Sequence, residues 1–361
     1  MKVAVLGYGT VGRGVYEMIC SSDFLEAGPV LVLPFEKTED FMVTSIDEIT
    51  GDDSVEAVCE CMGGVSAAFD FAVKVMNAGK HFVTSNKALV AAKGIELSEL
   101  SREKNVGFLF SAACGGAIPV LHNISVAKKT DEILSAGGII NGTTNFILSG
   151  IEEGKFTDYQ DALRVAQKLG YAEADPTADV SGLDTLRKVI LLSAVSFGLL
   201  PVDGMLLEGI ENIDLFREPD SKVRLIGCCG KNENGTVYSY VEPVLLKPYS
   251  TFAGVTSNFN QVMYKGKNSG TISLYGQGAG RYPTASAVLR DLTAIAAGER
   301  AMLPESCVGC TADNRFIKHK YYISEGNKSH ITDFVSVADM HREAKEMRES
   351  GRKVFFAEIE E

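Results

Sequence analysis

The sequence lacks any apolar run near the roughly 20 residues that a bilayer-spanning helix needs, so a membrane protein is not expected. It also lacks a basic excess, because 35 Lys and Arg face 47 Asp and Glu and give a formal net charge of −12. A negative surface argues against nucleic acid or an anionic membrane as a partner, although a local pocket for a small anion stays open. Residues 1–7 lack the length and the small-residue cleavage site of a secretory signal, and they are typical of a strand.

A metal centre is also not expected, because the cysteines and histidines lack ligand spacing. Eight cysteines are scattered through a 361-residue chain, which predicts reduced, buried thiols in a cytoplasmic protein. Only Cys307 and Cys310 have the separation of a metal or redox pair, and no second pair or histidine cluster accompanies them.

The composition is that of a globular protein, with 45% hydrophobic and 23% charged residues. The chain is long enough for two domains, since single cores stop growing at roughly 250–300 residues. Strand-like and helix-like segments alternate over the first 120 residues, which predicts a parallel sheet with crossover helices. The expected strands there are 3–6, 30–33, 57–61, 81–84 and 107–111.

The pattern changes after about residue 125, where alternating stretches between 223 and 275 suit an antiparallel sheet. The expected fold is therefore α/β, with an N-terminal Rossmann-type parallel sheet, an α+β catalytic and dimerisation domain, and a short C-terminal tail. The expected domains are 1–125 plus 277–300 for the dinucleotide, 126–276 for substrate and dimerisation, and 301–361 as an extension.

A glycine-rich turn follows the first expected strand and opens a helix; its residues are Gly7, Tyr8, Gly9, Thr10, Val11 and Gly12. In such a turn the first glycine permits the bend, the second lets the backbone approach a pyrophosphate, and the third lets helix and strand pack closely. The helix N-terminus adds N–H donors for the phosphates. The sequence therefore predicts a bound dinucleotide, but Glu36 and Lys37 offer one acid and one base near the ribose and leave NAD and NADP open.

An acid-rich segment lies between residues 170 and 188. A solvated acidic loop is the ordinary interpretation of such a run, but here the carboxylates alternate with small and apolar residues. Asp184 and Lys188 stand four apart at the start of an apolar helix, so they share a face. A lysine close to carboxylates and partly desolvated suits a proton donor or acceptor.

Over residues 1 to about 300 the sequence resembles the homoserine dehydrogenases. The family signature is matched with its spacing at Ala166, Gly170, Asp175, Pro176, Asp179, Gly182, Asp184 and Lys188. Three further segments, 79–89, 141–148 and 278–288, resemble the family in the same order along the chain.

The resemblance implies a reversible reduction of aspartate 4-semialdehyde to homoserine in threonine and methionine biosynthesis. Lys188 would give a proton to the aldehyde oxygen, and Lys87 would lie by the nicotinamide and substrate unless it is only a surface lysine. The implied substrate-binding residues are Glu173, Asp179, Asp184, Asn141, Gly142 and Thr143; carboxylates suit the ammonium group of a zwitterion, although 141–144 is alternatively a helix N-cap. The implied cofactor-binding residues beyond the turn are Gly63, Thr84, Ser85, Lys87, Gly278 and Gly280.

The resemblance further implies a monovalent cation such as sodium on the backbone of Cys114, Gly116 and Ile118. Ser111 stands where the family usually has a glutamate, and the missing carboxylate should weaken a hard-cation site. The basic residue that often follows the second strand is also missing, so the cofactor stays NADP or NAD. Many relatives carry a C-terminal ACT domain that binds threonine, and residues 301–361 are too short for a complete one.

Two other functions stay open. An aspartate-semialdehyde-type dehydrogenase would use Cys114 as a nucleophile with a histidine base, but no histidine motif accompanies it. A non-catalytic dinucleotide sensor would keep the glycine turn but have no use for Asp184 and Lys188. A homodimer is expected, because the strands of 223–275 would otherwise leave an apolar face exposed and the family pairs through a sheet there.

Overall fold

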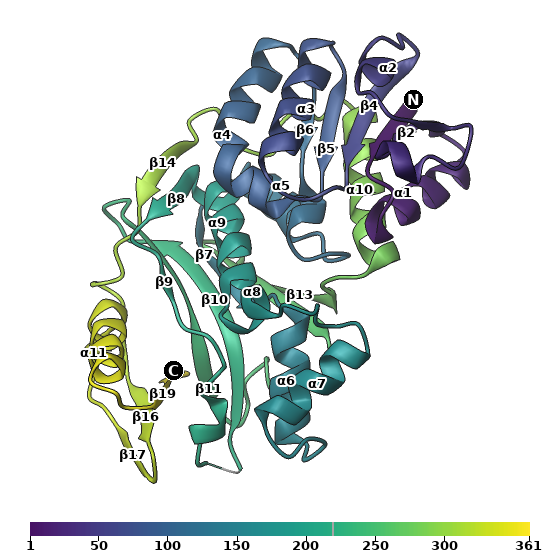
Figure 1. The fold of residues 1–361 in the computed structure, drawn as a ribbon. Helices are drawn as coiled ribbons and strands as arrows, with labels where there is room; N and C mark the ends of the chain where they lie inside the picture. The colour runs from purple at the N-terminus through teal and green to yellow at the C-terminus, as the bar shows by residue number, and fades with distance from the viewer. Residues whose placement is uncertain (219) are drawn as a thin grey trace. The chain divides into compact units, whose positions relative to one another are not determined.

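The computed structural model describes residues 1–218 and 220–361 (Figure 1). The chain divides into two compact units. Unit 1 comprises Met1–Lys129 and Gln277–Val308, and unit 2 comprises Thr130–Gly276 and Gly309–Glu361. Each unit has its own sheet and its own helices. Among the described residues, no helix combines the length and the apolar character needed to cross a bilayer.

Unit 1 is built on a six-stranded parallel sheet in the order β3-β2-β1-β4-β5-β6, so the expected N-terminal Rossmann-type fold is confirmed. Its strands are β1 Lys2–Leu6, β2 Glu26–Leu31, β3 Met42–Val43, β4 Val55–Glu60, β5 His81–Thr84 and β6 Phe108–Leu109. Its α-helices are α1 Thr10–Cys20, α2 Asp47–Thr50, α3 Ser66–Asn77, α4 Lys87–Glu103, α5 Val120–Ala127 and α10 Arg281–Ala296. Short 3-10 turns lie at η1 Pro34–Glu36 and η2 Ser111–Ala113.

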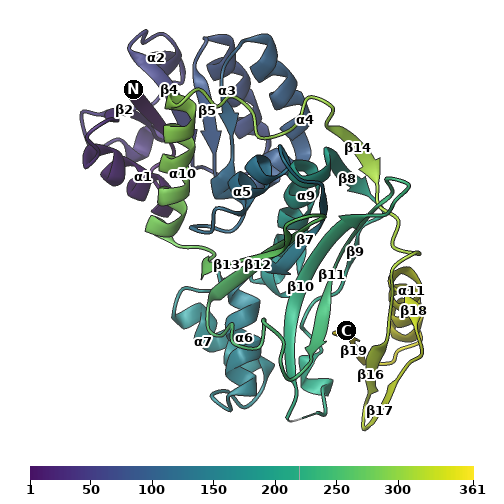
Figure 2. The ribbon, with the colours of Figure 1, turned by 180° about the vertical axis from the view of Figure 1, so that it is seen from behind.

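The position of β1 at the centre of this sheet explains its apolar sequence. Residues Val3 to Leu6 are fully buried, because β2 and β4 flank the strand and helices cover the sheet. Helix α10 returns from late in the chain and packs against α1 (Figures 1 and 2). That approach requires Gly14, whose Cβ would lie 2.8 Å from Cγ of Arg281.

The expected strand at 30–33 is shifted, since β2 spans Glu26–Leu31. The first half of β2 was not predicted, because it contains a glycine and a proline, and both residues are uncommon in the interior of a strand. The structure accommodates Gly28 and Pro29 in a bulge, where the register with β1 shifts between Val3 and Val5.

Unit 2 is built on a nine-stranded mixed sheet in the order β13-β12-β7-β10-β11-β19-β16-β17, with β9 beside β11 (Figure 2). Its strands are β7 Ile133–Ile139, β9 Leu206–Leu207, β10 Lys222–Lys231, β11 Val237–Leu246, β12 Phe259–Gly266, β13 Gly270–Gln277, β16 Tyr321–Glu325, β17 Lys328–Ile331 and β19 Val354–Ile359. Its α-helices are α6 Gly142–Glu152, α7 Tyr159–Lys168, α8 Thr177–Val180, α9 Leu183–Phe197 and α11 Val337–Glu349. Shorter elements are β8 Leu199–Asp203, β14 Val308–Thr311, β15 Lys318–His319, β18 Val335–Ser336 and η3 Ile213–Leu215.

The C-terminal residues extend the sheet of unit 2. Strand β19 runs parallel to β11, with Val244 opposite Glu358, and β16 pairs antiparallel with β19. Helix α11 contributes Met340 and Ala344 to an apolar cluster with these strands. Sequence patterning does not predict this pairing, because strand partners are not encoded in local periodicity.

Two carboxyl groups, one buried and one largely buried, lie together where β19 joins the sheet. Glu242 on β11 is fully buried, accepts a hydrogen bond from Tyr321 at 3.1 Å, and lies 2.9 Å from Nε2 of His341. Glu358 accepts a hydrogen bond from Tyr240 at 3.3 Å and hydrogen-bonds Glu242. Burial raises the pKa of both carboxyls and lowers the pKa of His341 to about 4. The pair therefore favours a shared proton over two buried charges.

This pair predicts a loss of stability at alkaline pH. Between about pH 7 and the Glu242 pKa of about 8, an unfolded glutamate carries no proton, whereas the folded pair still binds one, so the free energy of unfolding falls as pH rises. His341 and His319 do not contribute there, since burial lowers their pKa values. We expect Glu242→Gln, which places an uncharged hydrogen-bond donor beside Glu358, to reduce the change of unfolding free energy with pH. Urea unfolding at several pH values measures this change.

The exposed Glu343 on α11 provides the matched control. Glu343→Gln is expected to leave the pH dependence as in the wild type. Equal slopes for the wild type and Glu242→Gln would contradict the shared proton.

Candidate functional site

The glycine turn of unit 1 joins β1 to α1. Gly7 has a φ of +90°, and a Cβ on Gly12 would lie 2.0 Å from the carbonyl oxygen of Gly7. Neither position accommodates a side chain. Gly9 has open space where a Cβ would stand, and no side chain caps the N-terminus of α1. The first amides of α1 are thus available to an anion, as a dinucleotide pyrophosphate requires.

Glu60, at the end of β4, organises the loops beside this turn, and sequence reasoning missed it. Its carboxylate is fully buried and accepts hydrogen bonds from the amides of Met62 and Gly63 and from the hydroxyl of Thr84 at 2.5 Å. The hydroxyl of Thr84 in turn accepts from the amide of Asn86. One carboxylate therefore fixes the predicted cofactor residues Gly63 and Thr84 together, which no local motif signals.

Lys87 is the first residue of α4 and is half-buried. Asn86 caps this helix through the amide of Leu89 at 3.1 Å, and its side chain also donates to the carbonyl oxygen of Gly64 at 2.6 Å. The cap fixes the helix start and thereby the position of Lys87 next to Ser85, at the carboxyl end of β5.

The predicted cation segment lies against the residues preceding α10. A Cβ on Gly116 would lie 2.5 Å from the carbonyl carbon of Gly278, so the two backbones pack directly. Gly280, which precedes α10, has a φ of +123°. The structure therefore brings the predicted residues 116, 278 and 280 into one region of unit 1.

This segment fits a sodium ion poorly. The Ser111 side chain supplies no charge, and the carbonyl oxygen of Ile118 already accepts a hydrogen bond from Val120. The carboxyl of Asp291 accepts a hydrogen bond from the Ser111 amide at 2.7 Å, and burial raises its pKa to about 7. Cys114 is 1% exposed. The described residues also contain no group of three or more His, Cys, Asp or Glu side chains arranged for a metal.

A cluster of polar side chains forms in unit 2 where α6, α8 and α9 begin or end. Asn141 caps α6, because its side-chain oxygen accepts from the amide of Thr144 at 2.8 Å. Its side-chain nitrogen donates to Oδ1 of Asp179 at 2.7 Å and to Oδ2 of Asp184 at 3.0 Å. One amide therefore holds the two carboxylates together.

Lys188 completes this cluster on α9. Its Nζ lies 2.7 Å from Oδ2 of Asp184 and donates to the carbonyl oxygen of Ile140 at 2.6 Å. Lys188 is 8% exposed and Asp184 is 7% exposed. Gly182, with a φ of +84°, begins the helix in a left-handed conformation that favours glycine. The i, i+4 spacing read from the sequence thus corresponds to a buried ion pair.

The remaining predicted substrate residues differ in their surroundings. Burial is the main cause of the raised pKa of Asp179, followed by the nearby charge of Asp184. Thr143 donates to the carbonyl oxygen of Tyr171 at 2.6 Å. Glu173 is exposed, whereas Asp179 is half-buried. Burial therefore distinguishes Asp179 from Glu173, which the sequence pattern alone does not.

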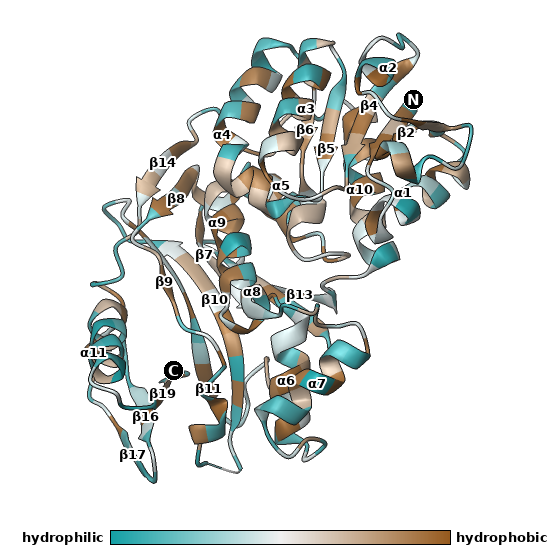
Figure 3. Ribbon diagram, in the orientation of Figure 1, coloured by the Kyte–Doolittle hydropathy of each residue, from teal (hydrophilic) through white to brown (hydrophobic). Residues whose placement is uncertain are grey.

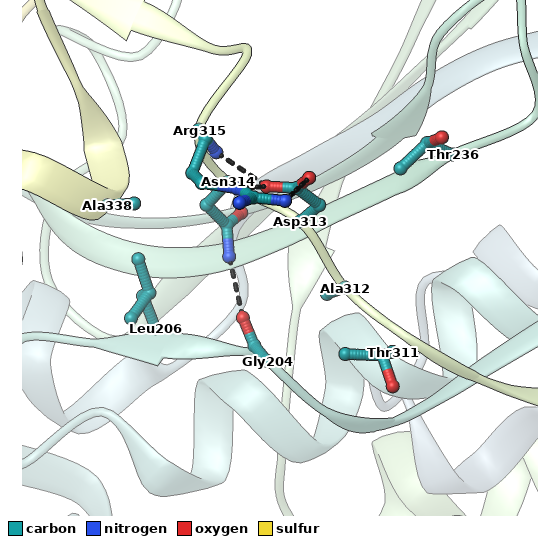
Figure 4. A pocket seen from close by; sticks show the side chains of 9 residues that line it. All are labelled: Gly204, Leu206, Thr236, Thr311, Ala312, Asp313, Asn314, Arg315 and Ala338. Carbon is teal, nitrogen blue, oxygen red and sulfur yellow. Dashed lines mark hydrogen bonds and ion pairs between the residues drawn. The ribbon is translucent and has the colours of Figure 1, made fainter.

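A separate hollow of about 490 Å³ in unit 2 does not gather reactive groups (Figure 4). Arg315 pairs with Asp313 at 2.7 Å, and Asn314 donates to the carbonyl oxygen of Gly204 at 2.8 Å. These polar side chains bind each other and the backbone. The cluster around Lys188 is the stronger candidate, because there a buried ammonium meets two carboxylates and could exchange a proton with a ligand.

Comparison with known proteins gives one family. The family model described as "Homoserine dehydrogenase, NAD binding domain" matches residues 7–111, and that described as "Homoserine dehydrogenase" matches residues 119–293. The homoserine dehydrogenase of Bacillus subtilis is 34% identical over 82% of this chain and 72% of its own length. The crystal structure of a homoserine dehydrogenase from Thiobacillus denitrificans has a TM-score of 0.85 at 27% identity, covering 100% of this chain and 98% of the other. That of Staphylococcus aureus has a TM-score of 0.75 at 28% identity, with the same coverage.

The double role of Asn141 predicts an unusually large loss of stability for Asn141→Ala. The change removes a helix cap, which costs about 1 kcal/mol. It also leaves the buried Asp184 and the half-buried Asp179 without their amide donor, which costs about 1–3 kcal/mol more. Asp158→Ala is the matched control, since Asp158 caps α7 through the amide of Asp161 and does nothing comparable elsewhere. If Asn141→Ala and Asp158→Ala lost equal free energies of unfolding in urea, Asn141 would act only as a helix cap.

Proposed function

The chain belongs to the homoserine dehydrogenase family, and from this premise we propose how its residues carry out the reaction. The protein is an NAD(P)-dependent oxidoreductase that acts on the CH–OH group of homoserine and interconverts L-homoserine and L-aspartate 4-semialdehyde. The reaction belongs to amino-acid biosynthesis. The observation that carries the proposed mechanism is the buried Lys188–Asp184 pair.

Asp179 and Asp184 bind the substrate. Homoserine and aspartate 4-semialdehyde both carry an ammonium group, and charge-assisted hydrogen bonds to carboxylates are the strongest that a protein offers such a group. Asn141 fixes the two carboxylates before the substrate arrives, so little ordering entropy is lost on binding. Thr143 and the backbone of Gly142 complete the substrate site, and Glu173 belongs to its exposed side.

Lys188 transfers the proton. In the reductive direction its ammonium donates to the aldehyde oxygen, and in the oxidative direction its amine accepts the hydroxyl proton of homoserine. Asp184 holds Nζ through the ion pair and stabilises the charged form. The carbonyl oxygen of Ile140 directs the same amine, so the donor is already aimed when substrate binds.

Unit 1 holds the dinucleotide. The turn residues Gly7 to Gly12 and the N-terminus of α1 bind the pyrophosphate, and the loop of Gly63 and the residues Thr84 and Ser85 lie at the nicotinamide end, with Gly278 and Gly280. When bound, the nicotinamide supplies or accepts the hydride. Lys87 positions the substrate beside it.

The alternative functions have less support. Cys114 is 1% exposed, so a substrate carbonyl has no access to its sulfur, as a thioester mechanism requires. A sensor without catalysis would not need a lysine buried against Asp184, because a buried ion pair is often no more stabilising than apolar side chains of similar volume. We assign no step to a sodium ion, since residues 111–118 lack a charged ligand. We place the enzyme in the cytoplasm, which fits its eight reduced thiols.

Lys188→Ala is expected to lower kcat by a factor of about 10² or more, the usual contribution of a general acid–base group. NADH binding, followed by fluorescence, should be unchanged, because its residues lie in unit 1. Added small primary amines should restore part of the rate, since they can replace the missing amine.

The exposed Lys168 on α7 supplies the control for this experiment. Lys168→Ala should keep the wild-type rate. A Lys188→Ala enzyme that loses stability but retains its turnover per folded molecule would show that Lys188 is structural.

We also propose a homodimer formed through the sheet of unit 2. Cys228 on β10 and Phe259 and Met263 on β12 are only partly buried. Hydrophobic colours run along much of β10 (Figure 3). A shallow hollow of about 190 Å³ on the sheet is lined by Cys228, Tyr238 and Met263. A second copy of the chain would bury these side chains.

Sedimentation at micromolar concentration is expected to give a dimer mass for the wild type and a monomer mass for Met263→Asp. Phe334→Asp alters another exposed apolar residue, 56% exposed near the C-terminus, and should remain dimeric. A wild-type monomer would refute the proposed dimer.

A further inference from the structure

A hollow of about 530 Å³ lies beside the glycine turn, at the carboxyl end of β2. Tyr8 and Arg13 line it from the turn and the first helix, and the other lining residues follow β2: Val32, Glu36, Thr38, Glu39, Phe41 and Met42. In a parallel sheet of this strand order, the segment after the second strand meets the adenosine ribose of a dinucleotide. The hollow is therefore placed to contact the ribose 2′ position, where NAD has a hydroxyl and NADP a phosphate.

The charges of this hollow oppose a phosphate. Glu36 and Glu39 contribute two carboxylates, and Arg13 is the one basic residue that lines it; Lys37, the base expected near the ribose, is not among the lining residues. The Arg13 guanidinium is already engaged with Tyr8, since its Nε donates to the Tyr8 carbonyl oxygen at 3.0 Å and its central carbon lies 5.2 Å from the Tyr8 ring centroid. Two carboxylates can accept hydrogen bonds from a ribose diol but repel a dianionic phosphate.

The position of Glu36 is fixed by the backbone. Its Oε2 accepts a hydrogen bond from the amide of Leu33 at 3.1 Å and so closes the 3-10 turn η1 that follows β2. Phe41, which lines the hollow, stacks on Tyr16 of α1 at 4.5 Å between ring centroids. The Leu33 amide thus keeps the Glu36 carboxylate at this hollow.

We propose that Glu36 and Glu39 are specificity-determining residues that make the enzyme prefer NAD to NADP. This inference rests on the proposed function, because it concerns the cofactor of that reaction. The carboxylates act on the adenosine end of the cofactor, so they should alter the choice of cofactor without altering the chemistry at Lys188.

The test compares kcat/KM for homoserine oxidation with NAD and with NADP, together with Kd values for NADH and NADPH from fluorescence. The wild type should prefer NAD in both measurements. Glu36→Gln and Glu39→Gln should each narrow the preference for NAD by about five-fold or more, because two unit charges about 4 Å apart in water repel by about 1 kcal/mol and the phosphate carries up to two charges. Glutamine retains an acceptor for the Leu33 amide, so η1 should persist. Glu99→Gln, at an exposed position of α4, is the charge-matched control and should leave the ratio unchanged.

Varying the ionic strength distinguishes electrostatic exclusion of the NADP 2′-phosphate from steric exclusion. Raising the salt from about 0.02 M to about 0.2 M should narrow the wild-type preference through screening, but should have little effect in the double variant Glu36→Gln/Glu39→Gln. A wild type that prefers NADP would overturn the proposal, and so would a ratio of NAD to NADP kcat/KM that neither substitution changes. In that case, a loss of NADPH binding in Arg13→Ala would identify Arg13 as a phosphate ligand. Absence of any homoserine oxidation with either cofactor would instead refute the proposed function, because the Kd ratio is measured without turnover.

Discussion

The ion pair between Lys188 and Asp184 is the interaction on which the substrate site depends. Burying an ammonium group costs several kcal/mol unless a counter-charge and further hydrogen bonds compensate it. Asp184 and the carbonyl oxygen of Ile140 provide that compensation, and Asn141 ties Asp184 to Asp179. The starts of α6 and α9 are thereby fixed by the groups that handle the substrate, so local folding and site geometry are set by the same hydrogen bonds.

The sequence predicted those parts of the structure that local periodicity and spacing encode. The parallel N-terminal sheet followed from alternating apolar segments, and the contact between Asp184 and Lys188 followed from their separation by one helical turn. Strand β2 was misplaced because Gly28 and Pro29 are tolerated only through a bulge. A bulge depends on the neighbouring strand and has no local signature.

Contacts between distant segments could not be predicted in the same way. Glu60 organises residues 62–63 and Thr84, yet in the sequence it is one glutamate at the end of a strand. The burial of Asp179 compared with the exposure of Glu173 was equally hidden, because both lie in one acidic segment of uniform composition. Tertiary packing determines which side chains of such a segment face the protein interior.

The buried carboxyl groups show why burial alone does not identify an active site. Glu60 is stabilised by backbone amides and a hydroxyl, and Glu242 by an acid–acid hydrogen bond with Glu358. Asp184 differs from both because its partner is a lysine ammonium, whereas Glu242 faces the Tyr321 hydroxyl, the His341 imidazole and the Glu358 carboxyl. The amides bound to Glu60 fix a loop, and the proton shared by Glu242 and Glu358 joins two strands. Asp184 instead holds an ammonium group, which has a proton available for transfer. The partner of a buried acid therefore indicates its function better than its burial does.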